Sequence, residues 1–392
     1  MGIRLPRFEE LSRDEQIEIL NLPLERTYLI TGGPGSGKTI LALYRAAQLR
    51  DKYKDLNITF LVYNKTLYRY LEKALRDLGL DDVSKVKTWH SWFYHYYRER
   101  TGARVPEIRP YCPDWETIFK NEITLLKDKF DHLIIDEAQD FPEPLLKILS
   151  NMATNASIFA DDHQQINDQD YKSGYNKAKI MEIQKIFRAE DRRYHLSRNY
   201  RNTEEIYKVG RLFYTGDAHD LSPKIYKKGE LPKVIKARFE EITDFIANYA
   251  DNNPEKNIGV LIPPKQSCRQ TIQKYYKTLK EKCSEASVQY YISNKSFGWN
   301  NKKNSENLDF DDDGIKIMTY LSAKGLEFET VFIPEIDDEL FENVDEILLN
   351  QLYVCATRAK DHLYFSYENE KSSSFVIKKL KESKTLVEFE EF

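Results

Sequence analysis

Short apolar runs alternate with longer amphipathic stretches through the first half of the chain. The longer stretches, such as Thr39–Leu49 and Leu67–Leu78, repeat their apolar residues at helical spacing. Short apolar runs between such helices are typical of buried strands, so the alternation predicts a parallel sheet wrapped by helices. The strands that we expect are Tyr28–Thr31, Ile58–Tyr63, Leu133–Ile135 and Ile158–Ala160.

A second set of apolar runs follows a polar, turn-rich stretch at Tyr214–Glu230. We therefore expect two α/β domains, with a boundary somewhere in 195–232. Residues 1–200 form the first expected domain, with a short insertion at about 92–130, and residues 201–392 form the second. The strands expected in the second domain are Pro232–Ala237, Asn257–Ile262, Val288–Ser293, Ile315–Tyr320, Thr330–Pro334 and Leu363–Tyr367.

Composition narrows the class of protein only a little. The chain has 392 residues, of which 41% are hydrophobic and 31% charged, as in an ordinary soluble protein. It contains no apolar stretch of bilayer length and no apolar signal region near residue 1, so the expected location is cytoplasmic. The net charge of −4 gives no general attraction to a polyanion, so any nucleic-acid contact must come from a local basic surface.

The four cysteines are widely and irregularly spaced, with no C-x-x-C pair. This spacing predicts reduced, mostly buried thiols rather than a zinc site or a disulfide framework. They are Cys112, Cys268, Cys283 and Cys355.

Residues 32–39 read GGPGSGKT and complete the pattern G-x-x-x-x-G-K-[ST] directly after an expected strand. Glycines let the backbone turn its N–H groups toward a phosphate, and the following helix directs its positive end to the same place. Lys38 is expected to reach the β- and γ-phosphate oxygens and Thr39 to bind Mg²⁺. The alternative is a glycine-rich turn without a ligand. The ATP-binding residues expected here are Gly32, Gly33, Pro34, Gly35, Ser36, Gly37, Lys38 and Thr39.

A second signal is the segment KFDHLIIDEAQDF, in which an apolar run ends at Asp136 and Glu137. The carboxyl ends of parallel strands are where open α/β sheets bind ligands. Asp136 is expected to hold Mg²⁺, and Glu137 to orient and deprotonate the water that attacks the γ-phosphate. An acidic pair after a strand can also be a solvated strand end, but a complete phosphate loop upstream favours the catalytic interpretation.

Together, these and further motifs resemble superfamily 1 helicases of the UvrD/Rep type, from about Leu11 to Phe365. The resemblance implies two RecA-like P-loop NTPase domains with an ATP site in the cleft between them. LSRDEQ looks like the adenine-reading motif, which makes Gln16 the base contact. DEAQD is similar to the family's acidic motif, and FADDHQQI implies that Gln164 senses the γ-phosphate.

Three motifs of the second expected domain extend this resemblance. LSRNYRN implies that Tyr200 stacks on adenine and that Arg201 is an arginine finger, and YVCATRAKDHLYF makes Arg358 a second finger. Guanidinium groups that reach the γ-phosphate across a closing cleft compensate the charge of the transition state. Each arginine alone could equally form a surface or interdomain salt bridge. MTYLSAKGLEF adds Lys324, Gly325 and Glu327 to the nucleotide site.

The motifs that line the nucleic-acid track in this family are less complete. Val62, Leu321 and Ile40 replace residues that the family usually carries, and the expected base stacker has only Tyr171 and Tyr175 as candidates. The aromatic and basic stretch that begins at Trp89 could stack bases, or its rings could pack against the core. The nucleic-acid contacts that the resemblance implies are Asn64, Thr88, Trp89, His90, Thr319 and Ser322.

The expected function is that of an ATP- and Mg²⁺-dependent translocase or helicase that moves 3′ to 5′ on single-stranded DNA. The spacing of the motifs leaves no room for the large accessory domains of UvrD and Rep. This favours keeping a second hypothesis, a nucleotide-gated ATPase subunit that regulates a partner nuclease in DNA repair or phage defence. RNA as the track is a third possibility, because nothing in the motifs visibly reads a 2′-hydroxyl.

Overall fold

The computed structural model describes Phe8, Leu11 and residues 15–53, 55–63, 65–77, 86–120, 130–161, 178–216, 223–292, 308–309, 312–369 and 373–392. The chain divides into two compact units between Arg198 and Asn199. We call Leu5–Arg198 the N-terminal unit and Asn199–Phe392 the C-terminal unit, and describe each by itself.

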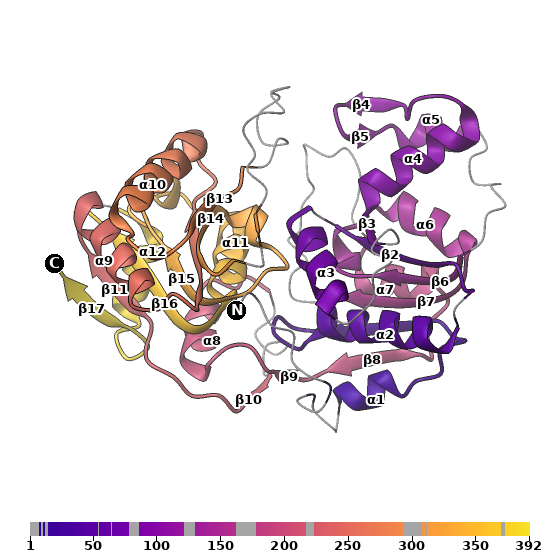
Figure 1. Cartoon of the computed structure of the whole chain (residues 1–392), viewed down its shortest axis with the longest axis horizontal. Helices are drawn as coiled ribbons and strands as arrows, with labels where there is room; N and C mark the ends of the chain where they lie inside the picture. Colours follow the sequence, from indigo (N-terminus) through magenta and orange to yellow (C-terminus); the bar gives the residue numbers. More distant parts are fainter. Residues whose placement is uncertain are drawn as a thin grey trace. The chain divides into compact units, whose positions relative to one another are not determined.

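A six-stranded sheet of strand order β3-β2-β6-β7-β1-β8 forms the centre of the N-terminal unit (Figure 1). All of its neighbouring strands run parallel. Strand β7 lies between β1 and β6, so three strand ends that carry motif residues are neighbours. The strands are β1 (Tyr28–Gly32), β2 (Ile58–Val62), β3 (Val86–Thr88), β6 (Phe130–Ile135), β7 (Ala153–Ala160) and β8 (Arg193–Leu196).

Helices flank this sheet, and their apolar side chains form a hydrophobic core together with those of the strands. The α6 helix (Glu143–Met152) carries Pro144 in its first turn, which suits a helix start because the N–H that proline lacks would have no intrahelical partner there. Its apolar side chains pack with those of the sheet and of α4 and α7 in one buried cluster. The other helices are α1 (Gln16–Leu20), α2 (Lys38–Lys52), α3 (Lys65–Asp77), α4 (Trp89–Thr101), α5 (Trp115–Lys120) and α7 (Ile180–Ile186).

The aromatic stretch after Thr88 is α4, and its rings pack inward. Trp92, Phe93 and Tyr96 belong to the buried cluster, and the Trp92 and Tyr96 rings stack with centroids 5.1 Å apart. A short hairpin, β4 (Glu107–Arg109) and β5 (Cys112–Pro113), follows the helix. For most of the rings, the structure therefore favours core packing over base stacking.

A seven-stranded sheet of order β13-β14-β12-β15-β16-β11-β17 forms the C-terminal unit, again with parallel neighbours. Its interior strand β12 is buried at every residue, which fits a strand covered on both faces. The strands are β11 (Lys233–Lys236), β12 (Asn257–Ile262), β13 (Val288–Tyr290), β14 (Gly314–Thr319), β15 (Phe328–Ile333), β16 (Ala359–Tyr367) and β17 (Glu388–Glu391). Two further short strands are β9 (Arg198–Asn199) and β10 (Lys224–Ile225).

Helices α9 and α10 pack against one another, as do α8 and α11 (Figure 1). Ile246 of α9 and Ile272 of α10 join the sheet residues in a second buried cluster. The C-terminal unit thus has a core of its own. Its helices are α8 (Glu204–Arg211), α9 (Phe239–Asp251), α10 (Cys268–Lys282), α11 (Glu346–Ala356) and α12 (Phe375–Glu382).

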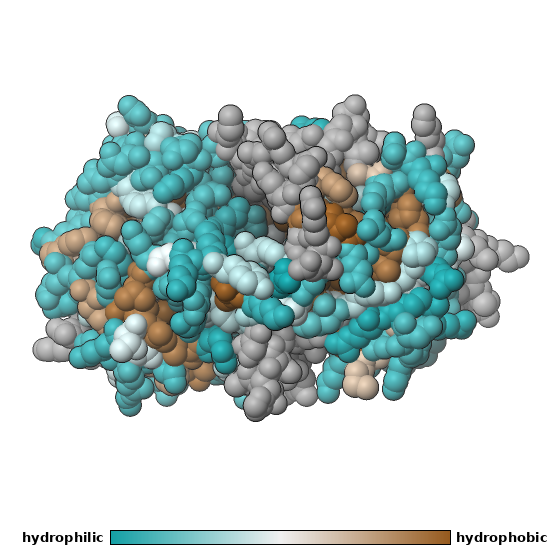
Figure 2. All heavy atoms as spheres, turned by 90° about the horizontal axis from the view of Figure 1, so that it is seen from below, coloured by the Kyte–Doolittle hydropathy of each residue, from teal (hydrophilic) through white to brown (hydrophobic). Residues whose placement is uncertain are grey.

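The α/β fold class with mainly parallel sheets is confirmed. Every expected strand is present within a few residues, whereas the short edge strands β3, β8 and β17 were not expected. All four cysteines are free thiols, and Cys283 alone is only partly buried. No helix in the described part of the chain has the length and apolar character that a bilayer crossing needs. The face drawn in Figure 2 is mostly hydrophilic, with smaller hydrophobic patches.

Candidate nucleotide-binding site

The expected phosphate loop joins the buried strand β1 to helix α2. Gly35 and Gly37 have φ values of 78° and 88°, which are left-handed conformations that suit glycine. A Cβ atom on Gly37 would lie 2.3 Å from Nε2 of Gln16, so a larger residue there would displace the end of the Gln16 side chain. The loop geometry is therefore built into the sequence G-x-G.

Lys38 is buried at the start of α2, and its ammonium group has three acceptors. Nζ donates to the carbonyl oxygens of Gly32 and Gly33, at 2.6 and 2.9 Å. It also forms a buried ion pair with Oδ2 of Asp161 at 3.0 Å. The charge needed for phosphate binding is thus held inside the loop by a carboxylate from the end of β7.

Asp136 follows β6 and contacts the start of α2. Its Oδ2 accepts a hydrogen bond from the Thr39 hydroxyl at 2.7 Å. Burial, and after it the neighbouring Glu137 carboxylate, raises the pKa of Asp136 to about 7, while Thr39 and Lys38 oppose the shift. This carboxylate therefore sits where a cation would favour its ionised form.

Glu137 lies next to Asp136 in a conformation that is uncommon for its residue type. Its φ and ψ are 57° and 44°, in the left-handed region. Gln139 donates from Nε2 to Oε2 of Glu137 at 2.5 Å and accepts at Oε1 from the backbone N–H of Asp161 at 3.0 Å. One glutamine thus connects the carboxylate expected as the base with the residue that binds Lys38.

Strand order explains why these residues meet. The phosphate loop follows β1, Asp161 follows β7 and Asp136 follows β6, and in the sheet β7 lies between β1 and β6. Because the strands are parallel, their carboxyl ends share one edge of the sheet. Asp161 was not expected as a site residue, although its position after a buried strand was the same signal that identified Asp136.

The described residues fit the expected magnesium ion. Thr39 and Asp136, the two expected ligands, already lie within hydrogen-bond distance of one another. No cluster of three or more His, Cys, Asp or Glu side chains able to hold a metal occurs among the residues that the structure describes. A site with few protein oxygens suits Mg²⁺, which is usually bound by one or two side chains together with water and phosphate.

The expected adenine contact Gln16 lies at the beginning of α1. It is buried, and its Nε2 donates to the carbonyl oxygen of Ser36 at 3.1 Å. The structure therefore brings Gln16 to the phosphate loop.

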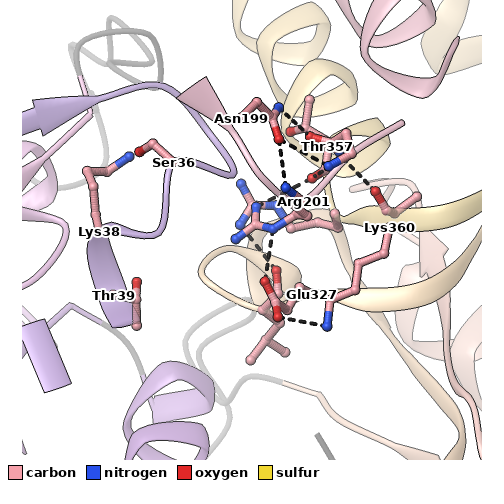
Figure 3. A network of polar contacts seen from close by, with 12 residues as sticks. Ser36, Lys38, Thr39, Asn199, Arg201, Glu327, Thr357 and Lys360 are labelled. Carbon is pink, nitrogen blue, oxygen red and sulfur yellow. Dashed lines mark hydrogen bonds and ion pairs between the residues drawn. The ribbon is translucent and has the colours of Figure 1, made fainter. Parts of the chain in front are cut away.

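In the C-terminal unit, Arg201 belongs to a partly buried ionic network (Figure 3). Its Nε donates to Oε2 of Glu327 at 3.0 Å, and Nζ of Lys360 lies 2.8 Å from Oε1 of the same carboxylate. The side chain of Asn199 accepts from the backbone N–H of Arg201 at 2.9 Å. Burial alone would raise the pKa of Glu327, but Lys360 and Arg201 together lower it to about 2.

The other expected nucleotide contacts of this unit differ in exposure. Arg358 is buried, and its guanidinium donates to the carbonyl oxygens of Val354 and Leu326 at 3.0 and 3.2 Å. An arginine finger must present its guanidinium to the phosphate, so this arrangement would have to change for Arg358 to act as one. Tyr200 is 38% exposed, whereas Lys324 is buried next to Gly325, whose φ is 82°.

The expected nucleic-acid contacts are mostly buried as well. The Trp89 ring has no exposed surface and stacks on His90, which corrects the expectation that Trp89 meets a base directly. Thr88 caps α4 by accepting from the backbone N–H of Ser91 at 3.3 Å. Thr319 and Ser322 are buried with their hydroxyl oxygens 3.0 Å apart. Asn64, Gln164, Tyr171 and Tyr175 lie outside the described residues.

Comparisons with known proteins point to the same family as the motifs. Residues 266–370 match the family model of the UvrD-like helicase C-terminal domain. Residues 25–209 match that of the Schlafen group 3 DNA/RNA helicase domain. The expected resemblance to UvrD-like helicases is thereby confirmed.

Two curated relatives match short segments. The chain is 44% identical over 69 residues to the Gabija protein GajB of Bacillus cereus (strain VD045), which is 18% of this chain and 13% of that protein. It is 39% identical over 59 residues to the RecBCD enzyme subunit RecB of Chlamydia pneumoniae, 15% of this chain and 6% of that protein. The chain thus spans only a small part of the length of these relatives.

One solved structure among the matches is the C-terminal domain of a possible DNA helicase from Lactobacillus plantarum WCFS1. It is 18% identical, and the match covers 48% of this chain and 97% of that one with a TM-score of 0.33. A score of this size adds nothing to the assignment made from the family models.

Proposed function

We propose that this chain is an ATP-dependent translocase or helicase that acts on single-stranded DNA and moves 3′ to 5′. ATP and Mg²⁺ are its cofactors. Hydrolysis is coupled to closure of the two units on the nucleotide, and each unit carries part of the machinery. The helicase-domain matches in both halves of the chain support this proposal.

The observation that carries the proposal is the set of contacts at the ends of β1, β7 and β6. Lys38 pairs with Asp161, Thr39 bonds to Asp136, and Gln139 joins Glu137 to the backbone of Asp161. These are the groups that ATP hydrolysis needs: a cation for the phosphates, oxygens for Mg²⁺ and a carboxylate for the attacking water.

In the proposed mechanism, Lys38 exchanges Asp161 for phosphate oxygens when ATP binds. Thr39 and Asp136 would hold Mg²⁺, and the ion would offset negative charge on the transferring phosphate. Glu137 orients the water and takes its proton. Gln139 holds the base in place, because it donates to the Glu137 carboxylate and accepts from the backbone N–H of Asp161. Gln164 is the proposed sensor of the γ-phosphate.

The proposed contribution of the C-terminal unit is electrostatic. Arg201 reaches the γ-phosphate as an arginine finger, with Tyr200 stacked on the adenine. Glu327 holds the Arg201 guanidinium in one orientation, which lowers the entropy that a long side chain loses on contacting its target. Arg358 is the second proposed finger, and Lys324 and Gly325 complete the nucleotide contacts.

The test is steady-state ATP hydrolysis with and without single-stranded DNA. We expect strong stimulation by the DNA, and a loss of activity on the order of a hundredfold or more in Lys38→Ala and Glu137→Gln. Lys147→Gln is the matched control, because Lys147 is an exposed lysine of the same unit that pairs with Glu143 on α6. Equal hydrolysis with and without nucleic acid would contradict the proposal.

Strand polarity needs its own measurement. Partial duplexes with a single-stranded tail at either the 3′ or the 5′ end separate the two directions. We expect displacement only from the 3′ tail. Matched RNA oligonucleotides in the ATPase assay decide whether RNA is the track. The match to a DNA/RNA helicase domain is a reason to test RNA beside DNA.

A second candidate is a nucleotide-gated ATPase subunit that regulates a partner nuclease or another effector in DNA repair or phage defence. The similarity to RecB, which is named as a subunit of an enzyme, favours this possibility. The two candidates differ in whether the chain displaces a DNA strand without a partner protein. A chain that hydrolyses ATP but displaces no strand until a partner protein is added would support the second candidate over the first.

A further inference from the structure

Arg45 is a buried arginine that the proposed mechanism does not use. It lies on α2, seven residues after Lys38, and has no exposed surface. Burial lowers its pKa to about 10. A guanidinium is costly to remove from water unless its donors are satisfied, so the partners of Arg45 indicate what its burial achieves.

Most of these partners are backbone carbonyl groups from one short segment. Nη1 donates to the carbonyl oxygens of Ile19 and Leu22 at 2.9 and 3.3 Å, and Nη2 to that of Pro23 at 3.4 Å. This segment is the end of α1 and the turn after it. A helix of five residues is not stable alone, so α1 depends on such contacts for its position.

The opposite side of the Arg45 guanidinium is anchored in the sheet. Nε donates to the Ser157 hydroxyl at 3.0 Å, and that hydroxyl lies 2.9 Å from Nε2 of His132. Burial, followed by the nearby Arg45 charge, lowers the pKa of His132 to about 3, so the histidine is neutral near pH 7. Arg45 therefore connects α1 to two strands through a fixed polar contact.

The beginning of the same segment has an anchor of its own. The Glu15 carboxylate accepts from the backbone N–H of Ser197 at 3.0 Å and also from the Ser197 hydroxyl. Gln16, which contacts the phosphate loop at Ser36, lies between this anchor and the Arg45 contacts. The end of the Gln16 side chain also lies close to Gly37, because a Cβ atom added to that glycine would come within 2.3 Å of Nε2.

We propose that Arg45 is a positioning residue that sets the base preference of the nucleotide site, because it fixes the segment that carries Gln16. This inference rests on the proposed function, in which Gln16 contacts the adenine. Arg45 itself touches neither the base nor the phosphates. Loss of the Arg45 side chain leaves the phosphate contacts of Lys38 and Thr39 in place, but Gln16 is no longer held in a fixed position beside the phosphate loop.

The experiment compares equilibrium binding of fluorescent ATP and GTP analogues with Mg²⁺ in the full chain. The variants are Arg45→Gln, Arg45→Lys, Gln16→Ala and the double variant Gln16→Ala/Arg45→Gln. We expect the wild type to prefer ATP, and Arg45→Gln to reduce this preference roughly three- to tenfold, the value of one hydrogen bond. Affinity for the GTP analogue should change much less.

The double variant separates positioning from general stability. If Arg45 acts through Gln16, adding Arg45→Gln to Gln16→Ala should produce no further loss of base preference. Arg45→Lys keeps a donor and should restore part of the preference. If Arg45→Gln does not fold, Arg45→Lys carries the test with an intermediate loss.

Lys52→Gln is the matched control on the same helix. Lys52 is exposed and pairs with Glu25, so it also joins α2 to the N-terminal segment, but at the surface. It should leave base preference unchanged. Equal losses for ATP and GTP in Arg45→Gln, or a further loss in the double variant, would overturn the inference. A wild type that binds neither analogue would instead contradict the proposed function itself.

Discussion

Each unit contains a carboxylate at a motif, fully buried for Asp136 and 14% exposed for Glu327, and the two carboxylates have opposite electrostatic surroundings. Asp136 of the N-terminal unit has a pKa raised to about 7 by burial and by Glu137. Glu327 of the C-terminal unit, which burial alone would shift upward, has a pKa lowered to about 2 by Lys360 and Arg201. Burial disfavours the charged form of both carboxylates. Nearby cations outweigh this effect for Glu327 but not for Asp136.

This difference indicates how each unit would take part in catalysis. The carboxylate of Asp136 is ready to gain from an added cation, which is the property of a metal ligand. Glu327 already has two cations, and its task is to hold Arg201. At Asp136, charge balance would therefore come from a bound cation, whereas Glu327 is already balanced by Lys360 and Arg201.

Among the variants that test this comparison, Asp136→Asn should have the largest effect. Asparagine keeps an oxygen for the Thr39 hydroxyl but removes the charge, so Mg²⁺-dependent ATP hydrolysis should fall on the order of a hundredfold or more. In the absence of Mg²⁺ and nucleotide, the same variant should unfold at an equal or higher temperature than the wild type. A variant that is both active and less stable would break the comparison.

Glu327→Gln should have the opposite effect on stability. It leaves Lys360 and Arg201 near one another without the carboxylate that both contact. Removing the shared partner of this partly buried network should cost about 1–3 kcal/mol of unfolding free energy, the value of hydrogen bonds to charged groups. Chemical denaturation measures this loss directly, and a change below about 1 kcal/mol would show that the network is not a stabilising one.

The dependence of stability on pH should differ in sign between the two carboxylates. For Glu327, whose ordinary pKa is 4.5, the contribution is present above that value and is lost as pH falls toward about 2. For Asp136, the raised pKa favours the folded state at low pH, and this contribution is lost as pH rises from 3.8 to about 7.

Thermal unfolding without Mg²⁺ or nucleotide measures both effects. Relative to the wild type, Glu327→Gln should flatten the acid side of the profile, and Asp136→Asn should flatten the change toward neutral pH. If both variants flattened the same side, the two carboxylates would not have the opposite surroundings described above.

The smallest expected effect is that of Glu329→Gln. Glu329 contacts Lys360 at 3.3 Å, but its side chain is 27% exposed and the pair is longer than that of Glu327. Its loss should change the unfolding free energy by less than about 1 kcal/mol. This variant is the matched control for Glu327→Gln, because it removes a carboxylate from the same lysine. A loss as large as that of Glu327→Gln would show that burial does not distinguish the two contacts.

The sequence was sufficient to predict the fold class and the position of Lys38, Thr39, Asp136 and Glu137 at one sheet edge, but not Asp161 as a member of the site. Apolar runs such as Asn257–Ile262 are fully buried strands with their bounds as expected. The short edge strands could not be found this way, because β3 and β8 have too few apolar residues to form a run. Their position depends on pairing with β2 and β1, which local sequence does not specify.

The sequence could not predict which side chains contact one another within the site. Asp161 belonged to a recognised motif, but its ion pair with Lys38 follows from β7 lying beside β1. Lys360 and Arg45 were not expected for the same reason, since their partners are distant in sequence. The burial of Trp89 was also decided by packing, because a tryptophan at a motif position can face either the core or a ligand.

The left-handed backbone of Glu137 has a consequence for attempts to make this protein more robust. A glycine there would adopt the same φ of 57° with less strain, and would leave out a buried carboxylate. Variants selected only for heat resistance would therefore tend to replace the residue on which hydrolysis is proposed to depend. At this position, a substitution that raises thermal stability would lower the rate of ATP hydrolysis.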